Sequence, residues 1–105
     1  MKIQQFLDIV FEIKNAKFDL HGVVGTLTAS NSTAKYYWQI IIEHRYNLNG
    51  NYAYALIKFD LRVNDTQFYL DAKEIAFSSL DQYLEFAKTE FVRQINNVEI
   101  YINEE

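Results

Sequence analysis

Apolar residues recur every three or four positions at the start of the chain. Between residues 2 and 15 this spacing predicts a helix with a buried stripe of Ile3, Phe6, Leu7, Val10 and Ile13. Phe11 falls off the stripe, and a strand over the same residues is the competing interpretation. Over residues 17–29 the alternation changes parity around Gly22 and Gly25, which indicates one strand bent by a bulge. Residues 30–34 then read as a loop.

The middle of the chain carries the clearest strand pattern. Even-numbered residues are mostly apolar over 36–46, and odd-numbered residues are apolar over 53–63. The Asn49-Gly50 pair between these runs predicts a hairpin with a two-residue loop, because both loop residues must adopt positive φ. Paired residue numbers then sum to 99, so Trp38 lies opposite Leu61 on the buried face.

The same reasoning applies to the turn that follows. With Asn64-Asp65 as a two-residue loop, paired residue numbers sum to 129. This register places Phe59 opposite Leu70 on the inner face and Lys58 opposite Asp71 on the outer face. Both turns give the same apolar face, so the sequence predicts a meander of three strands here.

Residues 79–95 read as a second helix. Ser79 and Gln82 have the spacing of a capping box. The apolar stripe that follows comprises Leu80, Leu84, Ala87, Phe91 and Ile95, flanked by Tyr83. Alternation over residues 98–102 predicts a short closing strand.

These elements predict an α+β fold of two layers. The N- and C-terminal helices pack on one face of a four-stranded antiparallel meander, in the order α-β-β-β-β-α-β. The 105 residues are expected to form a single domain. Ala53, Ala55 and Ala72 are expected to face the helices, where their small size lets a helix axis approach the sheet.

Composition and charge mainly exclude certain kinds of site and partner. The chain has no Cys, which excludes a disulfide scaffold, a thiolate metal site and a cysteine nucleophile. The net charge is −4, and no basic stripe for phosphate binding is visible, so we expect no nucleic-acid partner. Asp8 and Glu12 interrupt the apolar N-terminal stretch, which argues against a signal peptide or a membrane span. We therefore expect a cytoplasmic protein that does not contact a membrane.

The sequence contains no recognisable catalytic or metal-binding constellation. His21 and His44 lack further ligands at metal-site spacing, and His44 is expected at the rim of the core. Asp60 and Asp71 lie beside partners that keep both carboxylates ionised, which suits neither a general acid nor a general base. We expect no enzymatic activity, no cofactor and no metal. The alternative is a small-ligand-binding or enzymatic domain, with a pocket between helices and sheet lined by Tyr36, Trp38, Phe59 and His44.

The outer face of the sheet is the candidate functional surface. Tyr37 is expected opposite Arg62, and Tyr69 diagonal to Arg62. Tyrosine and arginine are enriched among residues that dominate protein-binding energy, whereas a plain solvated sheet also carries tyrosine and mixed charge. The sequence thus predicts a protein-binding site made of Tyr37, Tyr54, Arg62 and Tyr69.

Together these patterns favour a small non-enzymatic protein-binding module of the regulator, inhibitor or adaptor type. Ile, Asn, Lys, Tyr and Phe make up 43 of the 105 residues, and their AT-rich codons suit an accessory protein of a phage or mobile element. A homodimer is also expected, because Phe86 and Val92 lie off the helical stripe and Ile41 and Leu56 point outward from the sheet.

Overall fold

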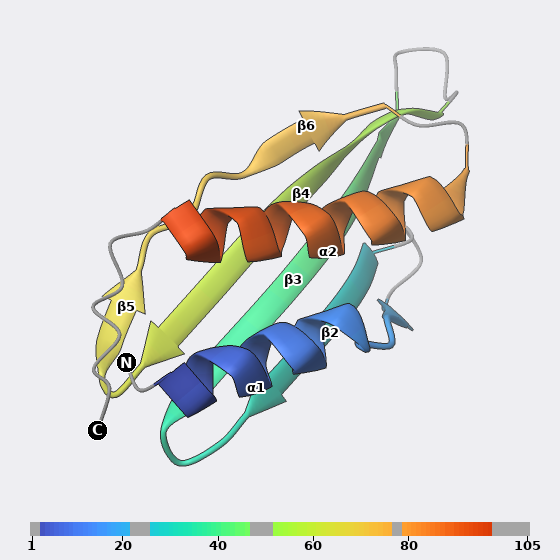
Figure 1. The fold of residues 1–105 in the computed structure, drawn as a ribbon. Helices are drawn as coiled ribbons and strands as arrows, with labels where there is room; N and C mark the ends of the chain where they lie inside the picture. Colours follow the sequence, from blue (N-terminus) through green and yellow to red (C-terminus); the bar gives the residue numbers. More distant parts are fainter. Residues whose placement is uncertain (1–2, 22–25, 47–51, 77–78, 98–105) are drawn as a thin grey trace.

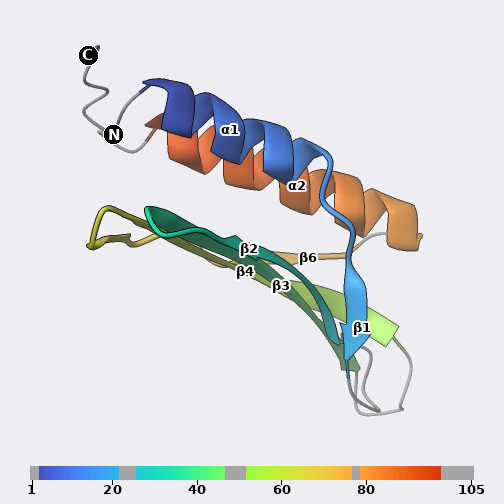
Figure 2. The same ribbon diagram turned by 90° about the horizontal axis from the view of Figure 1, so that it is seen from below.

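A computed structural model of the chain describes residues 3–21, 26–46, 52–76 and 79–97. Two helices, α1 (Ile3–Lys14) and α2 (Leu80–Asn97), lie side by side on one face of a six-stranded antiparallel sheet (Figure 1). Figure 2 shows the helices as one layer, the sheet as the other, and the far face of the sheet uncovered by these elements. The predicted two-layer α+β fold is confirmed, and the described residues form six strands in place of the predicted four.

The strands run in sequence order across most of the sheet. They are β1 (Asp19–His21), β2 (Thr26–Ser32), β3 (Tyr36–Tyr46), β4 (Tyr52–Val63), β5 (Thr66–Phe68) and β6 (Lys73–Ile75). Neighbouring strands follow the order β1-β2-β3-β4-β5, and β6 also pairs with β4. The predicted loop at Asn49-Gly50 and the predicted strand over 98–102 lie outside the described residues.

The predicted bent strand over residues 17–29 is wrong. The chain forms two antiparallel strands there, β1 and β2, with Leu20 opposite Leu27. The change of parity in the sequence therefore arises because the chain reverses direction, and not because one strand bulges.

The central hairpin has the register that its alternation predicts. Trp38 lies opposite Leu61, and the sum of 99 holds along the strands up to Arg45. Between Arg45 and Tyr46 the register shifts by one residue. Asn64 and Asp65 adopt φ angles of 49° and 69°, the left-handed conformation that a type I′ turn requires.

The third strand of the predicted meander is instead two short strands. β5 ends at Phe68, and β6 begins at Lys73 with the register shifted by one residue. Ile57 consequently lies opposite Lys73, and Ala72 is exposed outside the ladder instead of facing the helices. Two predicted pairs are wrong for the same reason: Phe59 with Leu70, and Lys58 with Asp71.

A buried amide on α2 accounts for this break. The Gln94 side chain accepts a hydrogen bond from the Asp71 backbone nitrogen (2.7 Å) and donates one to the Asp71 carbonyl oxygen (2.8 Å). These two bonds serve backbone groups that the ladder would otherwise pair. Residues 69–72 can therefore leave the sheet without leaving the Asp71 backbone unsatisfied.

A buried carboxylate next to Gln94 uses the shifted register. The single N–H of the Arg93 Nε atom donates to both Glu90 carboxylate oxygens, at 3.1 and 3.0 Å, and one of these oxygens lies 3.9 Å from the Lys73 Nζ atom. The hydrogen bond from Arg93 holds the pKa of Glu90 below its ordinary value, although burial opposes this. The register shift turns Lys73 toward the helices, where its ammonium group becomes the second cation, after Arg93, beside the buried Glu90 carboxylate.

The buried face of α1 also differs from the prediction. Ile9, which the predicted stripe omits, is fully buried together with Ile13, whereas Ile3 and Leu7 are exposed. Seven of the twelve residues of α1 are apolar and lie around much of its circumference, so periodicity alone does not fix the rotation of the helix.

The extent of α2 is close to its prediction. The Ser79 hydroxyl accepts a hydrogen bond from the Gln82 backbone nitrogen (3.4 Å), which caps the first turn. Phe86 and Val92 are half-buried against the core, so this helix packs on two sides. They therefore offer less outward apolar surface than the dimer prediction assumes.

Candidate functional site

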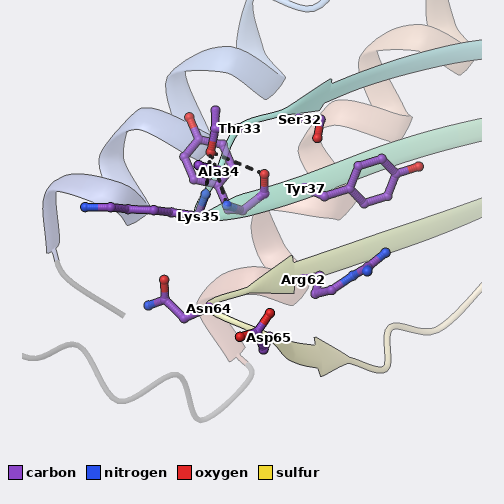
Figure 3. Close-up of a pocket in the computed structure, with 9 residues that line it drawn as sticks. Ser32, Thr33, Ala34, Lys35, Tyr37, Arg62, Asn64 and Asp65 are labelled. Carbon is purple, nitrogen blue, oxygen red and sulfur yellow. Dashed lines mark hydrogen bonds between the residues drawn. The ribbon is translucent and has the colours of Figure 1, made fainter.

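Two tight turns meet at one end of the sheet. In the turn between β2 and β3, the Thr33 hydroxyl accepts hydrogen bonds from the backbone nitrogens of Lys35 (3.2 Å) and Tyr36 (3.1 Å). The Asn64 backbone nitrogen, in the turn between β4 and β5, donates to the Lys35 carbonyl oxygen at 2.8 Å. This last bond ties the two turns into one rim (Figure 3).

Beside this rim, on the uncovered face, an arginine stacks on a tyrosine. The Arg62 guanidinium carbon lies 5.6 Å from the centroid of the Tyr37 ring, and the two residues are directly opposite on β4 and β3. Figure 3 shows both side chains lying alongside each other. Burial raises the pKa of the Tyr37 hydroxyl, with the charge of Asp60 adding to the effect, so the phenol keeps its proton at neutral pH.

A hollow of about 220 Å³ adjoins this pair. It is lined by residues 32–37, 64 and 65 together with Arg62, and its lining is mostly polar. Arg62, Lys35 and Asp65 supply its charged groups, although the Lys35 side chain extends away from the stacked pair (Figure 3). The site therefore offers hydroxyl and guanidinium donors with a net positive charge, on a chain whose overall charge is negative.

Arg62 differs from the other two arginines in having no ion pair within the described part of the chain. Arg45 lies 2.6 Å from Glu43, and Arg93 is hydrogen-bonded to Glu90. The guanidinium of Arg62 is thus positioned by an aromatic ring and not by a carboxylate. Its donors remain available to an acceptor on another molecule.

The four predicted site residues do not form one cluster. Tyr54 lies opposite Arg45, eight residues along both strands from the Tyr37–Arg62 pair, which corresponds to about 27 Å. Tyr69 is 92% exposed and lies between β5 and β6, outside the ladder. The structure brings together Tyr37 and Arg62 only.

The rim residues Lys35, Asn64 and Asp65 were missed by sequence reasoning. The signal for them lies in the register, because pairing Tyr36 with Val63 places the turn before β3 next to the turn after β4. Each turn is recognisable from its own residues, but their proximity follows only once both hairpins are considered together.

The region where the alternative reading places a pocket is occupied by packed aromatic rings. The His44 and Tyr83 rings lie 5.8 Å apart at 48°. Phe91 lies between Trp38 (6.2 Å, edge to face) and Phe59 (5.2 Å). In the described part of the chain, these rings contact one another between the helices and the sheet.

The fourth residue of that predicted pocket, Tyr36, is engaged with α1. Its hydroxyl donates to Glu12 at 2.5 Å, and the Asn31 side-chain amide donates to the same carboxylate. Burial and the hydrogen bond to Glu12 raise the pKa of Tyr36 to about 12. These two hydrogen bonds anchor α1 to β2 and β3. The Tyr36 hydroxyl therefore has a structural role.

The packed environment of His44 predicts a pH dependence of stability. Burial lowers the pKa of His44 below its ordinary 6.5, so the unfolded chain takes up this proton at a higher pH than the folded chain. The free energy of unfolding should therefore decrease as the pH falls below about 6.5, and level off below the folded-state pKa. Urea unfolding at pH 7.5, 6.5 and 5.5 measures this slope, and His44→Phe should abolish it; an equal slope in both proteins would contradict the assignment.

Among residues 3–21, 26–46, 52–76 and 79–97, no three His, Asp or Glu side chains converge as a metal site requires. The same residues contain no helix long and apolar enough to cross a membrane. Comparisons of the chain with models of protein families, with curated proteins and with solved structures gave no match. What the site can do must follow from its own geometry.

Proposed function

We propose that the chain is a non-enzymatic protein-binding module that contacts its partner through the Tyr37–Arg62 pair and the adjoining hollow. The observation that carries this proposal is the guanidinium of Arg62, stacked on Tyr37 and without an ion pair in the described residues. A regulator, inhibitor or adaptor in the cytoplasm of a host, encoded by a phage or mobile element, fits this mode of action. It also fits the abundance of amino acids that have AT-rich codons.

The chemistry of the site indicates what it would recognise. A guanidinium placed over an aromatic ring can donate two parallel hydrogen bonds to a carboxylate, while the ring packs against the partner's apolar atoms. The rigid sheet holds both side chains, so little conformational entropy is lost on binding. We therefore expect the partner to present an Asp or Glu side chain, or a backbone carbonyl, to this end of the sheet.

The test compares arginines at opposite ends of the same sheet face. After affinity capture from the host cells and purification of the captured protein, Arg62→Ala should weaken binding by about 1–3 kcal/mol. Arg62→Lys should recover only part of the loss, because lysine keeps the charge without the planar fork. Arg45→Ala, at the far end of the face, is the matched control and should bind like the wild type.

Two further variants define the extent of the surface. Tyr54→Ala and Tyr69→Ala retain normal binding if the contact is confined to the Tyr37–Arg62 end, and lose affinity if all four predicted residues take part. Equal affinity of the wild type and the Tyr37→Ala/Arg62→Ala double variant would refute the proposal, provided both proteins have the same unfolding midpoint.

A further inference from the structure

A hollow of about 310 Å³ lies between the end of α1 and the sheet. It is lined by residues 11, 12 and 15–17 at the end of α1, by residues 29–31 of β2, and by Trp38 of β3. Figure 1 shows α1 lying along the β2 side of the sheet. The hollow therefore belongs to the helical side of the fold, whereas Tyr37 and Arg62 lie on the uncovered face.

The indole nitrogen of Trp38 is an unusual group in this lining. Trp38 is 2% exposed, and its Nε1 atom has no hydrogen-bond acceptor among the described residues. A buried indole N–H normally has an acceptor, because burying it without one costs free energy. This nitrogen only donates, so the group that serves it must offer a lone pair.

The one carboxylate in the lining is already engaged with the sheet. The two oxygens of Glu12 accept hydrogen bonds from the Asn31 amide and from the Tyr36 hydroxyl. Lys17, by contrast, is exposed and has no ion pair in the described part of the chain. The Trp38 N–H and the Lys17 ammonium are thus two donors in one lining, and neither has an acceptor there.

An exposed aromatic ring supplies the apolar part of the hollow. Phe11, which falls off the predicted helical stripe, is 67% exposed. The end of α1 holds its backbone in place, because the backbone nitrogen and the side-chain amide of Asn15 donate to the Phe11 carbonyl oxygen at 3.1 and 2.9 Å. A ligand that covers this ring removes apolar surface from water.

We propose that this hollow binds a small organic carboxylate with an apolar body. One carboxylate oxygen accepts the Trp38 N–H, the Lys17 ammonium balances the negative charge, and the apolar body covers the Phe11 ring. If each non-hydrogen atom takes roughly the 30 Å³ of a water molecule in the liquid, the hollow holds about ten of them. That is the size of phenylacetate.

This site is separate from the Tyr37–Arg62 pair, so the two proposals stand or fall independently. A bound carboxylate would contact α1, β2 and β3 together, and it would add to the hydrogen bonds by which Glu12 holds the helix on these strands. We therefore expect saturating phenylacetate to raise the midpoint of thermal unfolding.

Nuclear magnetic resonance of the full chain tests the proposal directly. Trp38 is the only tryptophan, so an isotope-labelled protein gives one indole N–H signal. Phenylacetate at neutral pH should shift this signal in a saturable way, with a dissociation constant of about 0.1–5 mM, the range for so small a ligand. Phenylacetamide, which keeps the shape without the charge, should bind at least about tenfold more weakly. Inorganic phosphate, which has charge but no apolar body, should leave the signal in place.

Exposed residues of α1 and its C-terminal flank provide matched variants. Lys17→Gln should raise the dissociation constant of phenylacetate by at least about fivefold, whereas Lys14→Gln, outside the lining, should bind like the wild type. Phe11→Ala should weaken binding to a similar extent, and Leu7→Ala, at a residue that is 52% exposed on the same helix, should not.

Three results would each overturn the proposal. The first is an indole signal that does not move in phenylacetate up to about 20 mM. The second is equal affinity for phenylacetate and phenylacetamide. The third is an equal effect of Lys17→Gln and Lys14→Gln in variants that unfold at the same midpoint as the wild type.

Discussion

Replacing Phe91 with alanine is expected to lower the free energy of unfolding by about 3–5 kcal/mol, the range for truncating a fully buried aromatic ring. Phe91 stands between Trp38 of β3 and Phe59 of β4, so its removal opens a cavity between the helical layer and the centre of the sheet. Urea unfolding followed by the fluorescence of Trp38, the only tryptophan, measures the loss.

Replacing Phe91 with residues of different size tests whether the loss of stability comes from the cavity. Phe91→Leu fills part of the space and should cost less than half as much as Phe91→Ala. Leu80→Ala on the exposed first turn of α2 is the control and should change stability by less than about 1 kcal/mol. A loss below about 1 kcal/mol for Phe91→Ala would show that the helix does not pack on the sheet as described.

Gln94→Ala is expected to cost about 2–3 kcal/mol, from two hydrogen bonds to the Asp71 backbone and the space left by a buried side chain. The loss should be local as well as global, because no strand takes over the Asp71 backbone groups. Amide hydrogen exchange over residues 69–72 should therefore become faster than in the wild type.

Gln94→Met provides the matched control for this second prediction. It keeps the length and most of the volume of the side chain but neither donates nor accepts a strong hydrogen bond. It should therefore retain the packing and lose the protection of residues 69–72. Unchanged exchange at these amides in both variants would contradict the role assigned to Gln94.

Local signals in the sequence were sufficient to predict the strand register at the centre of the sheet. The Asn64-Asp65 turn needs two left-handed residues, and alternation on both strands leaves one register that buries Trp38 and Leu61 together. The break after Phe68 has no such local signal. It depends on the Gln94 amide, which lies 23 residues beyond Asp71, and nothing in residues 66–75 announces it.

For a related reason, the sequence correctly predicted the contact between only two of the four candidate site residues. Tyr37 and Arg62 belong to the central register, so their contact follows from the alternation. Tyr69 was placed by extending that register beyond the point where the chain leaves the sheet. Likewise, the exposed face of α1 depends on how the helix is rotated over β2, which a helix with apolar residues around much of its surface does not specify.

The position of α2 in the chain has a consequence for synthesis on the ribosome. Each hairpin of the sheet can close in microseconds once its strands have emerged, whereas translation adds about 5–20 residues per second. The eighteen residues of α2 thus take roughly one to four seconds to make. Throughout that interval the apolar face around Ile40 and Ile57 has no α2 to cover it, so the nascent chain exposes an apolar sheet face to chaperones and to neighbouring nascent chains until α2 has been made.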